Sequence, residues 1–448
     1  MEKAKRKACI GIVAVASQDE SGGERAESLI AAAKAEMEKT GVNVVCGSKV
    51  IWNPADAVEV CDNIKDKGID AVVILHATWI LDSLSYLIVN KLSVPVVLWA
   101  VPYTETFSFA CVQHMSSVLK SRGVKSKFVY GLPEDKALID ELRLTAESAL
   151  MCKLAEEMNI ALLGPRQTWR VAGPQDMSAE EWNFSDYFGT TIVHLEMTEL
   201  LKKVDAMSDK EAEDVLAQLK DRTGKVMCTD EDMKYAAKVY ASMKELMKEN
   251  KLDAVAAECY PSFDGITNLT ASWLADERVV VETEGDISHV MVKQLLNLCS
   301  DEGSTLLGEI GSILKDDNAL LISHGGSSGH FTANTVEEVE IHHSGDTGTY
   351  VGTPVRAMEK VTVAGMVGDN GKYKMLIGRG ETLPVTKEEW DAADNRLLVK
   401  LRFAGQVQDV IDTMIEKGVD HHVVIREGDF AKELEGFCDF MGVEKVII

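Results

Sequence analysis

The chain has 448 residues, more than one ordinary hydrophobic core holds, which predicts two or three domains. Hydrophobic residues make up 46% and charged residues 27%, a composition typical of a folded globular protein rather than a disordered one. The net charge of −25 argues against nucleic acid or an anionic membrane as a partner, because both need a positive protein face.

The cysteines and the N-terminus bear on the compartment. The nine cysteines are an odd number without a C-x-x-C pair, which predicts reduced, buried thiols in a cytoplasmic protein. The opening MEKAKRKACIGIVAVAS has the basic and apolar parts of a signal peptide, but the Ser-Gly-Gly turn and helical pattern that follow favour a first β-strand. No apolar run reaches the roughly 20 residues that a membrane span needs.

Strand and helix patterns alternate over residues 8–157. Apolar β-branched runs such as ACIGIVAVAS and IDAVVILHATW are separated by amphipathic helices, which predicts a parallel sheet covered by helices on both faces. No G-x-G-x-x-G follows the first strand, so the sequence does not predict an NAD site. We assign residues 1–157 to an N-terminal α/β domain.

The remaining chain predicts two further domains. Residues 158–312 again alternate between strands, such as NIALL and LDAVAA, and helices, and they form the predicted second α/β domain. Short β-type runs dominate residues 313–448, where VAGMVGDNGKYKMLIG predicts a hairpin turning at Asp-Asn-Gly. The predicted fold class is therefore α/β: two Rossmann-like α/β domains followed by a β-rich, barrel-like C-terminal domain.

Three potential metal ligands stand at or just after the ends of apolar runs. Glu284 follows VVVET, Glu309 lies in STLLGEIGS, and His324 ends ALLISH. An α/β scaffold presents its chemistry at strand ends, and carboxylate oxygens with imidazole nitrogens suit Mn²⁺, Co²⁺ or Zn²⁺. The spacings fit no single helix or strand, so only the fold can bring these residues together. The alternative is that they are solvated carboxylates in turns.

Other histidines and glycine-rich turns are less specific. Side chains of adjacent strand residues point to opposite faces, so at most one member of His342–His343 and one of His421–His422 can enter a site. The segments SGGER and SHGGSSGH can cradle a phosphate or form flexible turns. No G-x-S-x-G elbow supports a serine hydrolase.

Five segments together resemble the L-fucose isomerase and L-arabinose isomerase family of metal-dependent sugar isomerases. They are FSDYFGTTIVHLEMTELLKKVD, VVVETEGD, STLLGEIGS, ALLISHGG and GVDHHVV, and they keep the family's order and approximate spacing from residue 160 to the end. In the N-terminal third, VVILHATW and PVVLW occur in the order of the family's strands.

The resemblance implies a metal site and an assembly. It assigns metal ligation to Glu284, Glu309, His324 and His422, with His422 fitting the motif better than His421, and it implies a divalent metal such as Mn²⁺. It also implies three domains, and trimers or hexamers whose active sites lie between subunits.

The resemblance further implies substrate contacts from the N-terminal domain. Gln113 matches a family glutamine, Ser116 stands where arabinose isomerases have histidine with His114 nearby, and Trp99 occupies a fucose-isomerase-like position. We also expect Glu258, which closes a strand of the second domain, to bond sugar hydroxyls. Ser116 in place of histidine, together with Trp99, leaves the identity of the sugar open. A phosphorylated, sulfonated or deoxy sugar is compatible with these residues.

The predicted reaction is aldose–ketose isomerisation through a cis-enediol, with Glu284 and Glu309 as the catalytic carboxylates. One alternative is a non-catalytic sugar-binding protein, since N-terminal α/β units also occur in periplasmic-type binding domains. A second alternative is a metal-assisted hydrolase or lyase that uses the same ligands.

Overall fold

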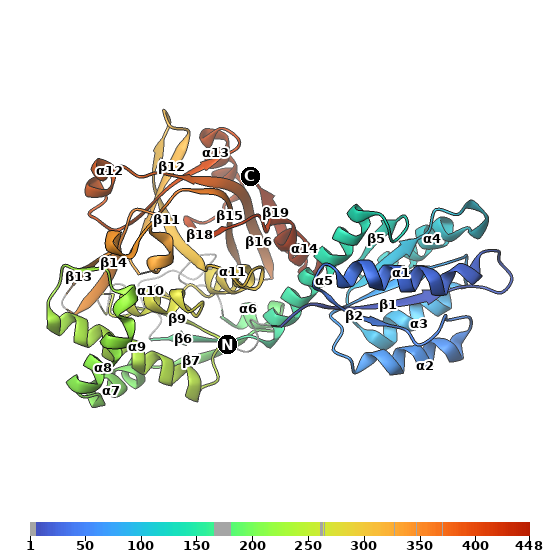
Figure 1. The fold of residues 1–448 in the computed structure, drawn as a ribbon, viewed down its shortest axis with the longest axis horizontal. Coiled ribbons are helices and arrows are strands. Elements are labelled where there is room, and N and C mark those ends of the chain that lie inside the picture. The colour runs from blue at the N-terminus through green and yellow to red at the C-terminus, as the bar shows by residue number, and fades with distance from the viewer. Residues whose placement is uncertain are drawn as a thin grey trace. The chain divides into compact units, whose positions relative to one another are not determined.

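A computed structural model describes residues 6–164, 181–259, 263, 265–326, 328–345, 347–369 and 371–448. The chain folds into two compact units (Figure 1). The N-terminal unit comprises residues 2–154 and 439–442, and the C-terminal unit comprises residues 155–438 and 443–448. The predicted boundaries at residues 157 and 312 stay predictions.

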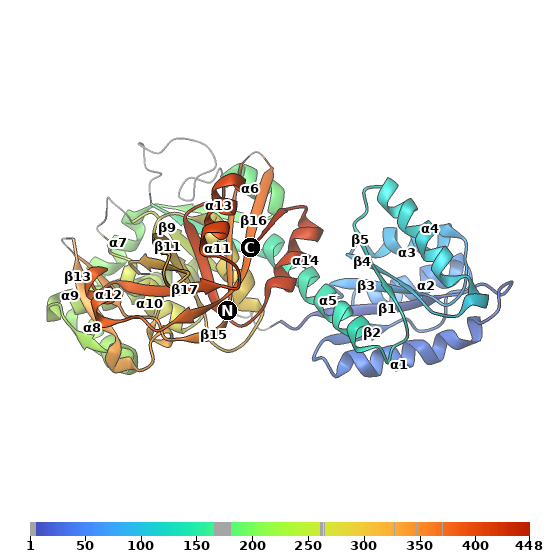
Figure 2. The same cartoon turned by 90° about the horizontal axis from the view of Figure 1, so that it is seen from above.

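The N-terminal unit is built on a five-stranded sheet in the order β2-β1-β3-β4-β5, with every pair parallel. Its strands are β1 (Cys9–Val15), β2 (Asn43–Cys46), β3 (Ala71–His76), β4 (Val96–Ala100) and β5 (Ser126–Tyr130). Its helices are α1 (Ala26–Glu38), α2 (Pro54–Lys65), α3 (Asp82–Leu92), α4 (Ser108–Ser121) and α5 (Lys136–Glu157). Helices cover both faces of this sheet (Figures 1 and 2), as the buried and almost entirely apolar strands β1, β3 and β4 require.

The C-terminal unit contains a second parallel sheet in the order β10-β9-β6-β7. Its strands are β6 (Asn159–Leu163), β7 (Thr191–Leu195), β9 (Ala254–Ala257) and β10 (Val280–Glu282). Its helices are α6 (Glu181–Phe188), α7 (Met197–Ala206), α8 (Asp209–Leu219), α9 (Asp230–Glu249), α10 (Asn268–Asp276) and α11 (Ile287–Leu298). Both parallel sheets agree with the predicted α/β class.

The later part of this unit is rich in strands, as predicted. The order β15-β18-β11-β12-β17-β16 closes on itself because β15 also pairs with β16, and β19 joins β16. The strands are β11 (Thr305–Leu314), β12 (Ala319–His324), β15 (Met358–Asp369), β16 (Lys372–Leu383), β17 (Leu397–Phe403), β18 (His422–Glu427) and β19 (Glu444–Ile447). Strands β15 and β16 form the predicted hairpin, whose Asn370 lies outside the described residues.

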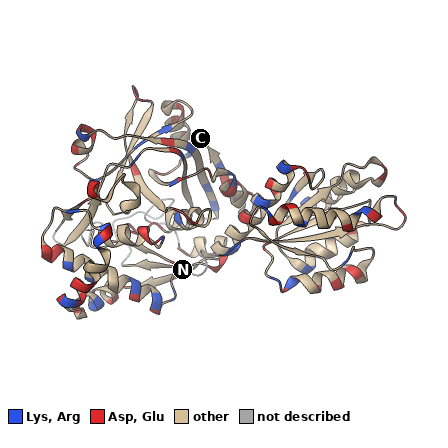
Figure 3. Cartoon of the chain, in the orientation of Figure 1, with Lys and Arg blue, Asp and Glu red and all other residues tan. Residues whose placement is uncertain are grey.

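Smaller elements complete the C-terminal unit. Strands β8 (Lys225–Val226), β13 (Glu340–Ser344) and β14 (Gly348–Gly352) form a separate small sheet, and the last helices are α12 (Lys387–Ala392), α13 (Val407–Lys417) and α14 (Ala431–Met441). Lysines and arginines are interspersed among the acidic residues on helices of both units (Figure 3). Within the described residues, no helix has the length and apolar character of a membrane span.

His76 is a buried polar group in the core of the N-terminal unit. It ends β3, its Nδ1 lies 3.0 Å from the Ile74 carbonyl oxygen, and its Nε2 lies 2.9 Å from the Ser85 hydroxyl of α3. Burial lowers the pKa of His76 to about 4, because the charged imidazolium would lose its hydration there. His76 is therefore neutral at neutral pH.

The buried His76 predicts acid sensitivity. A histidine in the unfolded chain has a pKa of about 6.5. Between that pH and about 4, His76 is protonated in the unfolded chain but neutral in the folded chain. The free energy of unfolding therefore decreases as the pH falls from 6.5 towards 4. His76 alone should lower the free energy of unfolding by about 2 kcal/mol between pH 7.5 and pH 5. Urea denaturation of the wild type and of His76→Gln at both pH values measures the effect. An equal loss of stability in both proteins would contradict it.

Candidate metal centre

Backbone pairing brings three of the predicted ligands together. Strand β11 lies between β18 and β12, and its Glu309 is paired with His422 on one side and with Ser323 on the other. His324 follows Ser323 and ends β12. A β-bulge between Ile310 and Ser312 comes directly after Glu309, an irregularity that re-aims side chains near functional sites.

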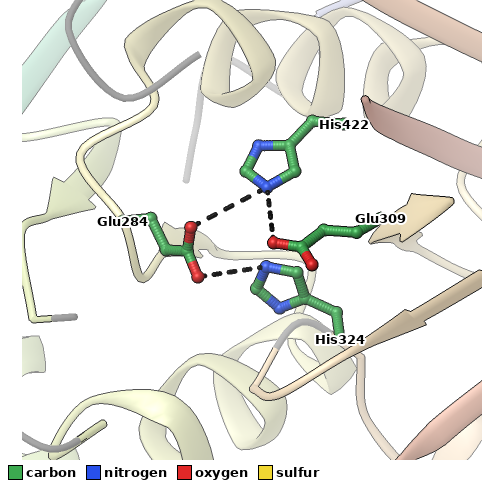
Figure 4. Close-up of side chains that lie close together, drawn as sticks. All are labelled: Glu284, Glu309, His324 and His422. Carbon is green, nitrogen blue, oxygen red and sulfur yellow. Dashed lines mark ion pairs between the residues drawn. The ribbon is translucent and has the colours of Figure 1, made fainter. Parts of the chain in front are cut away.

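The fourth predicted ligand comes from the parallel sheet. Glu284 follows β10, and its carboxylate faces the two imidazoles (Figure 4). The Nε2 atom of His324 lies 3.7 Å from one Glu284 oxygen, and the Nε2 atom of His422 lies 3.8 Å from the other. The Nε2 atom of His422 is also 3.5 Å from a Glu309 oxygen. The four donor atoms all lie within 4.8 Å of one another.

This donor set fits a divalent cation. Donors about 2.1 Å from one ion are themselves roughly 3–4 Å apart, and the three contacts between these imidazole nitrogens and carboxylate oxygens, at 3.5, 3.7 and 3.8 Å, lie in that range. The ionisation states also suit coordination. The adjacent His422 imidazole lowers the pKa of Glu309 to about 2 against the opposing effect of burial, and burial lowers the pKa of His324 to about 3. A carboxylate and a neutral imidazole are the forms that bind metal at neutral pH.

Exposure differs sharply across the cluster. The His422 and His324 side chains are 0% and 3% exposed, and that of Glu284 is 14% exposed, whereas that of Glu309 is 45% exposed. Glu309 therefore faces the open side of the cluster. Beside it, His421 is half exposed, with its Nδ1 2.7 Å from Asp420 and its Nε2 3.8 Å from Glu309.

Outer hydrogen bonds orient the two histidines. The Nδ1 atom of His422 lies 2.9 Å from a carboxylate oxygen of buried Asp286, and the Nδ1 atom of His324 lies 2.9 Å from the Gly325 carbonyl oxygen. An acceptor at Nδ1 places the proton there and leaves Nε2 with its lone pair towards the cluster. The other Asp286 oxygen accepts from the His289 amide and caps α11.

The loop that carries Glu284 is folded around a buried carboxylate. Glu282 accepts hydrogen bonds from the amides of Glu284 and Asp286, at 2.8 Å and 2.7 Å. Gly285 has φ +81°, and a Cβ there would lie 2.6 Å from Cγ of Glu258, so the turn requires glycine on both counts. Burial, together with repulsion from Asp286, raises the pKa of Glu282.

A histidine packs behind this loop. Buried His289, on α11, has its Nδ1 2.5 Å from Asp286. A Cβ at Gly365 of β15 would lie 3.1 Å from Nε2 of His289 and 3.0 Å from the His422 carbonyl oxygen, so glycine leaves room for both. Burial opposes ionisation of Asp286, but His289 and His422 together hold its pKa well below its usual range.

Sequence reasoning named the four clustered residues but not the supports Glu282, Asp286 and His289. The signal for Asp286 was present, because an aspartate immediately before an apolar helix is a typical N-cap. Predicted Glu258 lies beside the cluster, 1% exposed, and forms an isolated bridge with Glu284. The outlying pair His342–His343 contacts Glu340 and Asp232 instead of the cluster.

The other predicted substrate contacts belong to the N-terminal unit. Trp99 is fully buried in β4, and its indole donates to the Gly131 carbonyl oxygen at 2.9 Å. Gln113 and His114 are exposed on α4, and Ser116 is half-buried there. Their contact with substrate stays a prediction.

The chain is similar over most of its length to sulfoquinovose isomerases. It is 23% identical to that of Alkalicoccus urumqiensis over 380 residues, covering 82% of this chain and 83% of the relative. It is 21% identical to that of Priestia megaterium over 403 residues, covering 87% and 88%. These names agree with the sugar-isomerase part of the resemblance but not specifically with L-fucose or L-arabinose. No family model matches the chain.

Likeness to solved structures is low. A periplasmic solute binding protein of Actinobacillus succinogenes 130z with bound D-allose matches at a TM-score of 0.19 and 13% identity, over 65% of this chain and 92% of that one. A TM-score of this size supports no conclusion.

The hydrogen bond between Asp286 and His422 predicts that Asp286 affects metal binding through the imidazole. Asp286→Asn keeps an N-cap residue for α11 but replaces the anionic acceptor of His422, so Mn²⁺ affinity should fall about 10- to 100-fold. Isothermal titration calorimetry measures the affinity. The control is Asp276→Asn, which alters a buried aspartate that pairs with the partly exposed His330 outside the cluster. Equal affinities in the wild type and Asp286→Asn would contradict this role.

Proposed function

We propose that the chain is a metal-dependent aldose–ketose isomerase that acts on a sugar. The observation that carries the proposal is the convergence of Glu284, Glu309, His324 and His422 from three barrel strands and one loop. The similarity to sulfoquinovose isomerases supports a sugar substrate and makes sulfoquinovose, a sulfonated aldose, the first candidate. A pure sugar-binding protein has no need of this ligand set.

The proposed resident metal is Mn²⁺. Two carboxylate oxygens and two imidazole nitrogens form a mixed donor set that accepts Mn²⁺. When bound, such a cation polarises the sugar carbonyl and stabilises the negative charge that develops on its oxygen.

The protein's own groups move the protons. We assign Glu309 as the base that takes the proton from C2 of the open-chain aldose, because it is the exposed carboxylate of the cluster and is ionised at neutral pH. Returning that proton to C1 of the cis-enediol gives the ketose. The hydroxyl proton of O2 passes to O1, and we assign this relay to Glu284, which lies opposite Glu309 across the His422 imidazole nitrogen. Buried Glu258 is proposed to contact sugar hydroxyls.

We also propose that the chain self-associates, as a trimer or hexamer. The N-terminal unit exposes an aromatic patch made of Phe109, Phe128 and Tyr130, which are between 46% and 51% exposed. The Phe109 ring lies 5.9 Å from that of Phe128 and 5.7 Å from that of Tyr130. Contiguous exposed aromatic side chains are typical of interaction surfaces. A cytoplasmic location stays a prediction.

The test of the proposed activity is metal-dependent ketose formation. Chelator-stripped protein, with and without added Mn²⁺, is incubated with sulfoquinovose, L-fucose and L-arabinose while ketose is measured. Ketose formed only with metal supports the isomerase. Cleavage products instead of ketose would favour a hydrolase or lyase, and sugar binding without turnover would favour a binding protein.

Glu309 should be essential for turnover but not for folding. Glu309→Gln keeps the size of a half-exposed side chain but removes its basicity, so kcat should fall by about 10²- to 10⁴-fold with an unchanged circular dichroism spectrum. The control is Glu381→Gln on β16, a glutamate of similar exposure (41%) outside the cluster. Near-normal kcat in Glu309→Gln would refute the mechanism.

The aromatic patch should control assembly. Replacing both Phe109 and Phe128 by serine removes apolar contact area and should shift the protein to a smaller species in sedimentation equilibrium. Trp182→Ser, at an exposed aromatic of the C-terminal unit, is the control and should leave the mass unchanged. A wild type that sediments as a monomer would contradict the assembly.

A further inference from the structure

Strand β18 carries two buried polar side chains that both contact α11. His422 and Arg426 are four residues apart, so they point to the same side of the strand, and they are 0% and 1% exposed. The alternating residues Val423 and Ile425 belong to the apolar core of the barrel. The side of β18 that bears His422 and Arg426 is the one that meets α11.

The two contacts lie at opposite ends of the helix. At its N-terminus, the capping residue Asp286 holds Nδ1 of His422 at 2.9 Å. At its C-terminus, the Arg426 guanidinium donates to the Asn297 side-chain oxygen at 3.0 Å and to the carbonyl oxygens of Ser300 and Glu302 at 3.0 Å and 2.6 Å.

Arg426 is an unusual buried cation. Its hydrogen-bond acceptors are neutral oxygens, and no ion pair with a carboxylate is found for it within the described ranges. The C-terminal end of a helix carries partial negative charge, which favours a cation placed there. Burial, with a contribution from nearby Arg278, lowers the pKa of Arg426 to about 10, so it remains charged at neutral pH.

Hydrogen bonds to His422 and Arg426 connect both ends of α11 to the same strand, β18. The helix has 12 residues and is about 18 Å long, and His422 and Arg426 lie about 13 Å apart along β18, so the two residues can reach opposite ends of the helix. The helix packs against β9 and β10 of the parallel sheet as well as against β11, β15 and β18, and the Gln294 side chain bonds it to the Asp253 carbonyl oxygen at 2.7 Å. Arg426 adds the hydrogen bonds that fasten the C-terminal end of the helix to β18, the strand that carries His422. With its C-terminal end bonded to Arg426, the helix keeps the Asp286 carboxylate in line with Nδ1 of His422.

We propose that Arg426 is a positioning residue of the metal centre, which acts through α11 to hold Asp286 against His422. This inference rests on the proposed metal-dependent function. It assigns a role in metal binding to a side chain that touches none of the four ligands.

The test is Arg426→Lys in the full-length protein. Lysine keeps the charge but cannot reach the Asn297 side chain and two carbonyl groups at once. A pocket of about 60 Å³ beside Arg426 gives water room to replace the lost atoms, which favours retention of the fold. Mn²⁺ affinity, measured by calorimetry, should fall about 3- to 10-fold, which is less than the loss expected for Asp286→Asn, because Asp286 contacts a ligand directly.

The matched control is Arg356→Lys. Arg356 lines the same pocket and bonds both oxygens of Glu427, the residue after Arg426, but no hydrogen bond or ion pair to α11 is found for it among the described residues. Its Mn²⁺ affinity should match the wild type. If Arg356→Lys weakens Mn²⁺ binding as much as Arg426→Lys, the specific role of Arg426 is refuted.

A double-mutant cycle separates positioning from general stability. Residues at opposite ends of a helix normally have additive effects, but if Arg426 acts through Asp286, then Arg426→Lys should cost little further affinity in an Asp286→Asn background. Full additivity would overturn the inference. Should Arg426→Lys fail to fold, Asn297→Ala replaces it in the same cycle, because it removes the Nη1 contact and leaves the arginine.

The failure of the inference is distinguishable from that of the proposed function. Wild type that binds no Mn²⁺ would refute the metal centre itself. Wild type that binds Mn²⁺, together with Arg426→Lys of equal affinity, would refute only the role of Arg426.

Discussion

The pairing of β11 with its two neighbours is the constraint on which the candidate site depends. Glu309 lies opposite His422 on β18 and opposite Ser323 on β12, next to His324, so backbone hydrogen bonds set the separation of three potential ligands. Side chains alternate along a strand, so a slip of one residue would turn Glu309 away from His422. Only Glu284 is placed by other means, through the loop after β10.

That loop shows how a buried polar network can hold a site in place. Glu282 binds two of the loop's own amides, and Asp286 accepts from a helix amide and contacts two imidazoles. Buried charges are costly unless they are paired and hydrogen-bonded, and this network meets that condition through short local contacts. The same network fixes His422 with its Nε2 towards the other ligands, which is the orientation that coordination needs.

The residues that would carry out the isomerisation differ from those that would select the sugar. Carboxylates and imidazoles around one cation serve the carbon chemistry common to aldose–ketose isomerisation, whatever the sugar carries elsewhere. Substrate choice depends on side chains that meet the rest of the sugar, and the predicted ones, such as Gln113 and His114, lie in the N-terminal unit.

The sequence alone determined the α/β alternation, the hairpin at Asp-Asn-Gly and the four residues that cluster, because these depend on local periodicity, on turn chemistry and on the resemblance of short segments to known sugar isomerases. Sequence did not identify Asp286, His289 or Arg426 as supports of the site. Their roles come from contacts between α11 and β18, elements more than 120 positions apart, and no local pattern encodes such a contact. Only the tertiary structure decided that β18 carries both His422, a candidate metal ligand, and Arg426, which bonds the C-terminal end of α11. This arrangement depends on the register of β18 in its sheet and on the position of α11 against that strand.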